Sequence, residues 1–335
     1  MSRIKETESR YYQRGISLLK RAYKEAKDEG HDFSDNAIKI KIKNESITIM
    51  EVLFGAIWAS KKWSHKYRPN TWSQYRCSIR FVAELFLKRG KINQETFEKV
   101  CLILEKTRAG DKKELELRTS SLKKKSFNPK EVKAFEDFVN QENKKYRWGK
   151  ATLYWIKASV LIGLRPVEWK EARYLEKEKC LIVKNAKNTN GRAIGEIRHL
   201  SLKHLNEDEI NIVLKHLDFS RRMYDNEKWD LYYQGCANFI KYATRKIWPY
   251  KEKRPSLYSG RHQFSANMKA SGCKRNEVAA LMGHSTDETA SQHYGKKIFG
   301  TRLRKPDVNV NDLRKVKVVE PYKFSFKNNP KNNKK

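Results

Sequence analysis

Apolar side chains recur at spacings of three and four residues through much of this 335-residue chain, and this periodicity restricts the fold more than any other feature. Such spacing places the apolar residues on one stripe of an amphipathic helix. Residues 6–29 carry one stripe, and Gly30 predicts the end of that helix. From about residue 45 to 110 the pattern is helical again, and in its best example Thr71 caps a helix that closes at Gly90. The apolar positions are Tyr12, Ile16, Leu19, Tyr23 and Ala26 in the first stripe and Trp72, Tyr75, Ile79, Val82 and Phe86 in the second.

The second half of the chain also begins with helical sequence. Pro129 is typical of a helix start, and a further apolar helix, TLYWIKASVLI, runs into Gly163. Pro166 suits the first turn of a following helix. Arg165 should therefore lie at a corner between helices, where its side chain can be aimed.

One stretch of this half has the composition of β-strands. Residues 180–184 and 193–202 are the two candidate strands, and Asn190-Gly191 between them favours a hairpin turn. Helical sequence resumes after the second strand. The predicted fold class is therefore mainly α with a small β-sheet, an α+β arrangement.

Length and composition predict two domains with a linker between them. A chain of 335 residues is too long for one ordinary core. The stretch 107–126 lacks large aromatics and is crowded with charged and small polar residues, as exposed linkers are. The predicted order is a helical segment over 1–40, a helical domain over 41–112, a basic linker over 113–126, a larger domain over 127–302 and a mobile basic tail over 303–335.

The net charge favours nucleic acid as the partner. It amounts to +34, from 73 Lys plus Arg against 39 Asp plus Glu, and such a surplus repels itself unless a polyanion neutralises it. An anionic membrane is the competing explanation, but no apolar run approaches the roughly 20 residues of a spanning helix, and we expect no signal peptide. Basic residues among the aromatics of the predicted helical domain are candidate phosphate contacts. These are Lys61, Lys62, Lys66, Arg68, Arg76 and Arg80.

Neither the cysteines nor the carboxylates indicate a metal site. The five cysteines are scattered without a CxxC pair, which argues against zinc and disulfides and for a reduced, cytoplasmic protein. No tight carboxylate cluster compels a metal. Phosphodiester cleavage can instead use Arg, Lys and His around the phosphate, because a guanidinium presents paired N–H donors to two phosphate oxygens.

Five short motifs occur in one order in the second half of the chain. They are GLRPVE (163–168), the hairpin lysine Lys187, YSGRHQFSANMKASG (258–272), LMGHS (281–285) and HYG (293–295). In content, order and spacing they resemble the boxes of the tyrosine recombinases, or phage-type integrases. The resemblance implies that 127–302 is a catalytic domain. It extends to 41–112, as a core-type DNA-binding domain, only in general character.

The resemblance implies a role for each matched side chain. Tyr294 would attack phosphorus and leave a 3′-phosphotyrosyl link, so that no metal, cofactor or ATP is needed. Arg165 and Arg261 would bracket the scissile phosphate and neutralise charge that grows in the transition state. Lys187 would protonate the leaving 5′-oxygen, and His284 would hydrogen-bond the phosphate or assist proton transfer.

The residues beside the two arginines include one match and one departure. Glu168, three residues after Arg165, resembles the family's supporting acidic residue, which orients a neighbour by hydrogen bonds. Tyr258 departs from the family, which commonly has histidine three residues before the second arginine. A phenol can still donate a hydrogen bond to phosphate, but it is not a cation at neutral pH. His262 is a poor substitute, because one residue along a helix points about 100° away from Arg261.

The second departure is the interval from His284 to Tyr294. It spans ten residues, one more than the family's usual run. We expect a turn after His284 to absorb the extra residue, because Ser285 and Thr286 both offer capping oxygens. His293, next to Tyr294, is a candidate extra phosphate ligand.

The resemblance predicts a site-specific recombinase or integrase acting on double-stranded DNA. It implies two protomers on each crossover site and four in the synaptic complex, exchanging a C-terminal segment within 296–335. Accessory proteins that bend DNA or set the direction of the reaction are further implied partners. Two other functions stay open: a type IB topoisomerase-like relaxing enzyme, and a catalytically silent DNA-binding protein, which only Tyr258 and the longer interval support.

Overall fold

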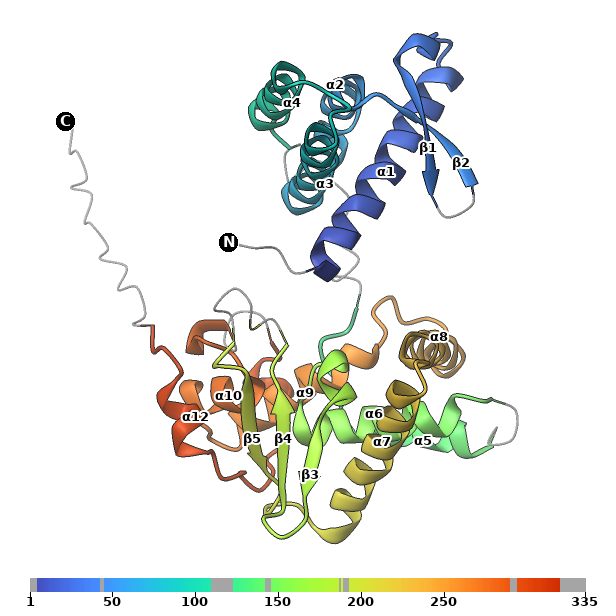
Figure 1. Ribbon diagram of the computed structural model, residues 1–335. Helices are drawn as coiled ribbons and strands as arrows, with labels where there is room; N and C mark the ends of the chain where they lie inside the picture. Colours follow the sequence, from blue (N-terminus) through green and yellow to red (C-terminus); the bar gives the residue numbers. More distant parts are fainter. Residues whose placement is uncertain are drawn as a thin grey trace, which may run out of the picture. The chain divides into compact units, whose positions relative to one another are not determined.

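The chain divides into two compact units, residues 1–117 and 118–335, which are described separately (Figure 1). The described residues are mainly helical and contain two small antiparallel sheets, which confirms the predicted fold class. None of their helices is long and apolar enough to cross a membrane. The computed structural model describes residues 5–42, 45–109, 123–141, 146–186, 188, 193–289 and 294–319.

The first unit packs helices and a β-hairpin around an apolar core. Helix α1 (Lys5–Asp28) carries the predicted stripe, and Gly30 follows it with a φ of +81°. The fully buried core side chains include Leu19, Ile49 and Val82. The later elements are η1 (Ser34–Asn36), β1 (Ala37–Ile42), β2 (Glu45–Met50), α2 (Val52–Lys62), η2 (Ser64–Lys66), α3 (Pro69–Lys88) and α4 (Gln94–Lys106).

The hairpin of β1 and β2 corrects the sequence prediction, which gave helix on either side of residue 45. The strand sequences AIKIKI and ESITIM alternate with a period of two, and this period buries one face of a strand. Ile38 pairs with Ile49 and Ile40 with Ile47. Strand β2 packs against α1. The short alternating stretch was obscured by the longer helical pattern that follows it.

Helix α3 begins three residues earlier than predicted. Pro69 occupies its first turn, where a missing backbone N–H costs nothing, so Thr71 lies inside the helix and does not cap it. Gly90 follows the helix with a φ of +65°, as the predicted closure requires.

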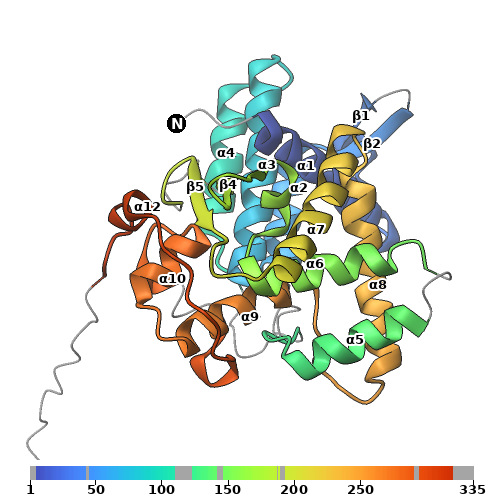
Figure 2. The ribbon, with the colours of Figure 1, turned by 90° about the horizontal axis from the view of Figure 1, so that it is seen from below.

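The second unit is built around α6 (Gly149–Ile162), which crosses its middle in Figure 2 and contacts four other helices. The fully buried aromatic side chains of this unit include Trp155 of α6 and Trp169, which follows that helix. The surrounding elements are α5 (Pro129–Gln141), η3 (Pro166–Lys170), α7 (Glu207–Asp225), α8 (Trp229–Ile247), α9 (Leu257–Ala270), α10 (Arg275–Met282), η5 (Lys297–Phe299) and α12 (Val310–Arg314).

A three-stranded antiparallel sheet completes this unit. Its order is β3 (Arg173–Leu175), β4 (Cys180–Lys184) and β5 (Ile197–Ser201). The last two strands are the predicted hairpin, although the second begins at Ile197 and not at 193. Strand β3 was missed because three residues are too few to show a period. The predicted Asn190-Gly191 turn lies outside the described residues. Strand β5 lies beside α10 (Figure 1).

The described part of the predicted C-terminal tail is folded against this unit. Asp312 of α12 is 3% exposed and accepts a hydrogen bond from the backbone N–H of His199 at 2.7 Å. Asp287 is equally buried and accepts one from the N–H of Val319 at 2.9 Å. The prediction of a mobile tail is therefore wrong up to Val319, and residues 320–335 lie outside the described part of the chain.

Candidate active site

Arg165 and Glu168 lie at the corner between α6 and η3. Gly163 ends α6 with a φ of +74°, and Pro166 lies in the first turn of the helix that follows, which is the short 3-10 helix η3. The fully buried carboxylate of Glu168 accepts hydrogen bonds from the backbone N–H of Arg165 at 2.8 Å and from its Nη1 at 2.6 Å. The Nε of Arg165 is buried and has no hydrogen-bond partner in the described part of the chain.

Three arginines share the carboxylate of Glu168. Arg198 of β5, also fully buried, donates to Glu168 Oε2 at 2.8 Å, and Arg261 Nη1 lies 3.7 Å from the same oxygen. Burial opposes ionisation of Glu168, but the charges of Arg198, Arg261 and Arg165 outweigh burial and hold its pKa far below the usual range. Three guanidiniums against one carboxylate leave a surplus of positive charge inside this unit.

Arg261 of α9 is 1% exposed, and its guanidinium is held from several segments. Nη1 donates to the carbonyl of Gly163 at 2.5 Å, and Nη2 donates to the carbonyl of Met282 at 2.7 Å. Nη2 also lies 3.0 Å from His284 Nε2. Nε donates to the hydroxyl of Tyr294 at 3.4 Å. The guanidinium therefore joins the end of α6, the end of α10 and the segment that carries Tyr294.

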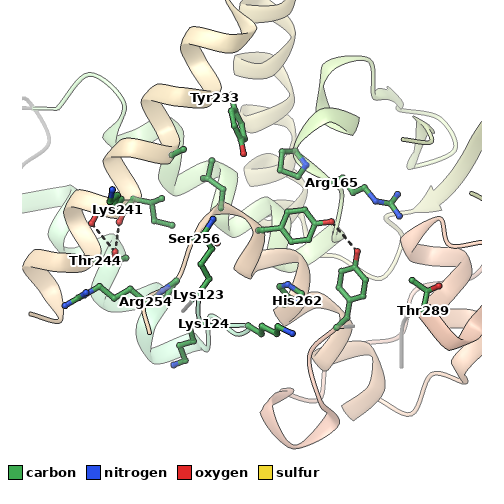
Figure 3. A pocket seen from close by; sticks show the side chains of 18 of the residues that line it. Lys123, Lys124, Arg165, Tyr233, Lys241, Thr244, Arg254, Ser256, His262 and Thr289 are labelled. Carbon is green, nitrogen blue, oxygen red and sulfur yellow. Dashed lines mark hydrogen bonds between the residues drawn. The ribbon is translucent and has the colours of Figure 1, made fainter. Parts of the chain in front are cut away.

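Two phenols meet beside this arginine. The hydroxyls of Tyr258, on the first turn of α9, and Tyr294 lie 3.2 Å apart (Figure 3). Burial raises the pKa of Tyr258 to about 12. Burial acts on Tyr294 in the same direction, but the charge of Arg261, the hydrogen bond to Tyr258 and the charge of Arg165 bring its pKa below the ordinary value. Tyr294 is therefore the phenol of the pair that ionises first.

Two histidines flank Tyr294, and the ring centroids of His262 and His284 each lie 5.0 Å from that of the tyrosine. Burial, with the charge of Arg261, lowers the pKa of His284 to about 2, and burial with the charge of Lys125 lowers that of His262 to about 4. Both rings are therefore neutral at pH 7. The Nδ1 of each is buried without a hydrogen-bond partner among the residues described.

An open pocket of about 1280 Å³ brings these side chains together. Arg165, Tyr258, His284 and Tyr294 all line it, while Arg261 lies behind the lining. His262 lines it as well. His262 was predicted to be a poor substitute beside Arg261, but the helical rotation that turns it away from Arg261 points its ring toward Tyr294.

Basic side chains surround one side of this pocket. In the view of Figure 3, Lys123, Lys124 and Arg254 lie to the left, and Arg165 lies to the right. Apart from Arg165, the basic side chains of this pocket come from the segment before α5, from α8 and from the loop before α9. We call this set the basic rim, and its members are Lys123, Lys124, Lys125, Lys241, Arg245 and Arg254.

The structure brings most of the predicted catalytic side chains into one cluster. Tyr294 reaches Arg261 despite the ten-residue interval that follows His284. Lys187 and His293 lie outside the described residues. The clustered residues are Arg165, Tyr258, Arg261, His284 and Tyr294.

Sequence reasoning missed Arg198 and Asn185. Arg198 alternates with Leu200 on the buried face of β5, whereas Ile197, a residue expected inside, is 43% exposed. Asn185 follows β4 and accepts a hydrogen bond from Arg198 Nη1. A charged residue in register with buried apolar residues was the available signal.

The candidate phosphate contacts of the first unit fall into two groups. Lys61 and Lys66 are exposed near the end of α2. Lys62, Arg76 and Arg80 bind oxygens of their own unit, and Arg76 and Arg80 thereby also hold α3 against α4. The pairs are Lys62 with Glu29, Arg76 with the carbonyl of Leu104 at 3.0 Å and Arg80 with Glu105 at 3.2 Å.

The chain matches no known protein-family profile and no curated protein. It is similar to the solved structure of XerH site-specific recombinase bound to difH substrate, with 15% identity over 84% of this chain and 75% of that one and a TM-score of 0.46. It is also similar to the Tn1549 transposon integrase in complex with a circular intermediate DNA, with 15% identity over 76% of this chain and 85% of that one and a TM-score of 0.40. A third similar structure is a lambda integrase dimer bound to a COC′ core site, with 12% identity over 82% of each chain and a TM-score of 0.41.

Proposed function

We propose that this chain is a tyrosine recombinase that cleaves and rejoins DNA strands through a 3′-phosphotyrosyl link at Tyr294. One observation carries the proposal: the Tyr294 hydroxyl lies 3.4 Å from the Nε of a buried arginine, Arg261, in a pocket that Arg165 also lines. A phenol is a weak nucleophile unless its ionised form is favoured, and neighbouring guanidinium charge favours it. The motif resemblance supports the same reading.

The pocket is suited to an anion that has several oxygens. Arg165 Nε and the Nδ1 atoms of His262 and His284 are buried beside it without partners among the described residues. A phosphodiester could accept hydrogen bonds from Arg165 and from a ring N–H of His284. The surplus of guanidinium charge around Glu168 also favours an anion there. Because negative charge grows during attack on phosphorus, the fixed guanidiniums should stabilise the transition state more than the bound substrate.

In the proposed reaction, the Tyr294 oxygen forms a bond to phosphorus as the bond from phosphorus to the 5′-oxygen breaks. The phenol loses its proton, and the leaving oxygen gains one to become a 5′-hydroxyl. Lys187 is the proposed proton donor, on the basis of the resemblance alone. The phosphotyrosyl ester keeps the free energy of the broken bond, so attack by a 5′-hydroxyl rejoins a strand without ATP, metal or other cofactor.

Tyr258 supports the nucleophile in this proposal. Its pKa of about 12 keeps its proton in place at neutral pH, so it can donate a hydrogen bond to the ionised oxygen of Tyr294 throughout the attack. A histidine at this position could carry charge to the phosphate, but the phenol here stabilises the attacking oxygen. His284 acts as a neutral hydrogen-bonding group, because its pKa is about 2.

We also propose that DNA lies across the basic rim. The net charge of +34 supplies long-range attraction, and each neutralised phosphate releases bound counterions. On the first unit the proposed phosphate contacts remain Lys61, Lys62, Lys66, Arg76 and Arg80.

Assembly is proposed as two protomers on each crossover site and four in the synapsis. Because α12 packs on its own unit through Asp312, an exchanged C-terminal segment would consist of residues 320–335 or would require α12 to detach. Accessory proteins that bend DNA or set direction stay part of the proposal by resemblance.

A covalent-trapping experiment tests the function. A nicked duplex made from DNA that flanks the gene should trap the wild-type protein as a complex that survives denaturing electrophoresis. Tyr294→Phe should form none, while Tyr224→Phe, an exposed tyrosine of α7 away from the pocket, should behave as wild type. Absence of the complex with wild type, or its persistence in Tyr294→Phe, would refute the assignment.

A further inference from the structure

Arg198 contacts three separate segments that carry proposed catalytic residues. We propose that Arg198 is a positioning residue, whose buried guanidinium fixes Arg165, the hairpin that carries Lys187 and the turn that carries His284 relative to one another without touching DNA. The catalytic consequence of this inference rests on the proposed function. The positioning itself does not.

The first contact fixes Arg165. Arg198 Nη2 donates to Glu168 Oε2 at 2.8 Å, and the other oxygen of Glu168 accepts from Arg165 Nη1 at 2.6 Å. A carboxylate held on both sides cannot rotate without breaking one of these bonds. The direction of the Arg165 side chain therefore depends on Arg198.

The second contact fixes the base of the hairpin. Arg198 Nη1 donates to Asn185 Oδ1, and Asn185 Nδ2 donates to the carbonyl of Gly195 at 2.9 Å on the opposite side of the hairpin. The next N–H along the chain, that of Ala186, donates to Glu168 Oε1 at 3.3 Å. Lys187 follows directly, so the backbone immediately before it is tied to the same cluster.

The third contact fixes the end of α10. Arg198 Nε donates to the carbonyl of Leu281 at 3.2 Å. Gly283 follows with a φ of +66°, and a Cβ built there would lie 2.7 Å from Arg198 Nη1 and 2.6 Å from Asn185 Oδ1. The guanidinium thus packs directly against the backbone of the residue that precedes His284.

The cost of burying Arg198 argues that its geometry matters. The side chain is fully buried, and it shares one carboxylate with Arg165 and Arg261. A buried ion pair of this kind is often no more stabilising than apolar side chains of similar volume. A planar guanidinium can, however, reach three acceptors in fixed directions, which a lysine ammonium cannot. We therefore infer that the buried guanidinium of Arg198 serves to fix the positions of three segments.

Hydrogen exchange of the full-length protein tests the positioning without reference to activity. In Arg198→Met we expect amide exchange to accelerate about tenfold or more in residues 184–186 and 281–286, because local opening there loses its hydrogen-bonded anchor. Helices α7 and α8 should exchange as in wild type. Arg173→Met, which removes an exposed arginine of strand β3 in the same sheet, is the matched control and should leave both segments unchanged. Unchanged exchange in Arg198→Met, or equal acceleration throughout the unit, would overturn the inference.

Cleavage kinetics test the consequence. With saturating protein on the nicked duplex, Arg198→Met should form the covalent complex about 10–100-fold more slowly than wild type. This range is typical when a residue that orients a site residue by hydrogen bonds is lost. Its DNA affinity should stay within about threefold, since no phosphate contact is removed. Arg198→Lys should be intermediate.

The outcomes separate the two proposals. If wild type forms no covalent complex, the proposed function fails, and the exchange experiment still decides the role of Arg198. If wild type cleaves and Arg198→Met cleaves at the same rate per bound DNA, the inference fails and the proposed function stands.

Discussion

The arginines of the two units are held in opposite ways. In the second unit, Arg198 and Arg261 are at most 1% exposed, and each has several acceptors drawn from different segments. Arg165 is 6% exposed and binds the same carboxylate, that of Glu168. In the first unit, the side chain of Arg80 is 50% exposed and has one carboxylate partner, at 3.2 Å.

This difference in burial indicates different roles for the arginines of the two units. A buried guanidinium is costly unless its partners are closely matched, whereas an exposed ion pair contributes about 1 kcal/mol or less. In the function that we propose, the second unit holds its guanidiniums in fixed directions toward a reacting phosphate. The first unit presents charge that acts over a distance and weakens with salt.

Removing the carboxylate at the centre of the buried cluster should have the largest effect. Glu168→Gln leaves three guanidiniums without a counter-charge and should lower the free energy of unfolding by about 3–5 kcal/mol at pH 7. Glu105→Gln, the partner of exposed Arg80, should cost less than about 1 kcal/mol. Urea unfolding of both variants measures the contrast, and equal costs would contradict it.

The same variant has a predictable pH dependence. The pKa of Glu168 in the folded protein lies below its unfolded value of about 4.3, so its stabilisation is complete above that pH and is lost as the pH falls toward the folded pKa. The difference between wild type and Glu168→Gln should therefore narrow below about pH 4. A difference that widened with acid would show the opposite linkage.

Loss of a buried arginine should act on rate and not on attraction. Arg261→Ala should slow covalent-complex formation by about 10²–10³-fold, because a fixed donor to the transition state is removed. DNA affinity should change far less. Single-turnover cleavage and equilibrium binding on one duplex separate the two, with Arg173→Ala as an exposed control. A loss confined to affinity would place Arg261 with the first unit's surface charges.

Removing the second phenol should have a smaller effect that depends on pH. Tyr258→Phe deletes a hydrogen bond that lowers the pKa of Tyr294, so that pKa rises in the variant. The rising limb of the cleavage rate should shift to higher pH, with about a tenfold loss near neutrality for one hydrogen bond. A pH–rate profile of both proteins checks the shift. An unshifted profile would show that Tyr258 does not act on the nucleophile.

A single exposed contact should have the smallest effect. Arg80→Ala should weaken DNA binding a few-fold and reduce the slope of log affinity against log salt by about one, as expected for one lost phosphate contact. Binding titrations at several salt concentrations measure this slope. An unchanged slope would show that Arg80 serves only Glu105 and the packing of α3 on α4.

Long periodic segments allowed most of the fold to be predicted. The apolar stripe of α1, which includes Leu19 and Ala26, is buried. Strands β4 and β5 pair in antiparallel fashion, as predicted for a hairpin. Short segments did not carry enough signal. The β1 hairpin spans six residues a strand, and β3 only three, so a period of two could not be separated from neighbouring helical sequence.

The candidate site was predictable only where motifs marked it. The residues that support those motifs come from afar: Arg198 reaches a carboxylate thirty positions away, and local sequence gives no sign of that partner. Its strand even misleads, because Ile197 faces outward and Arg198 inward. Three-dimensional pairing of buried charges depends on the whole fold and not on local pattern.

The bond between Tyr294 and DNA is the most direct test of the function. After nuclease trimming and tryptic digestion of the trapped complex, mass spectrometry should find the residual nucleotide on the peptide of residues 276–296, which contains Tyr294. Tyr258, whose hydroxyl lies 3.2 Å away, falls on a different peptide, residues 254–261. A nucleotide on the first peptide is the predicted result; a nucleotide on the second, or on neither, would contradict it.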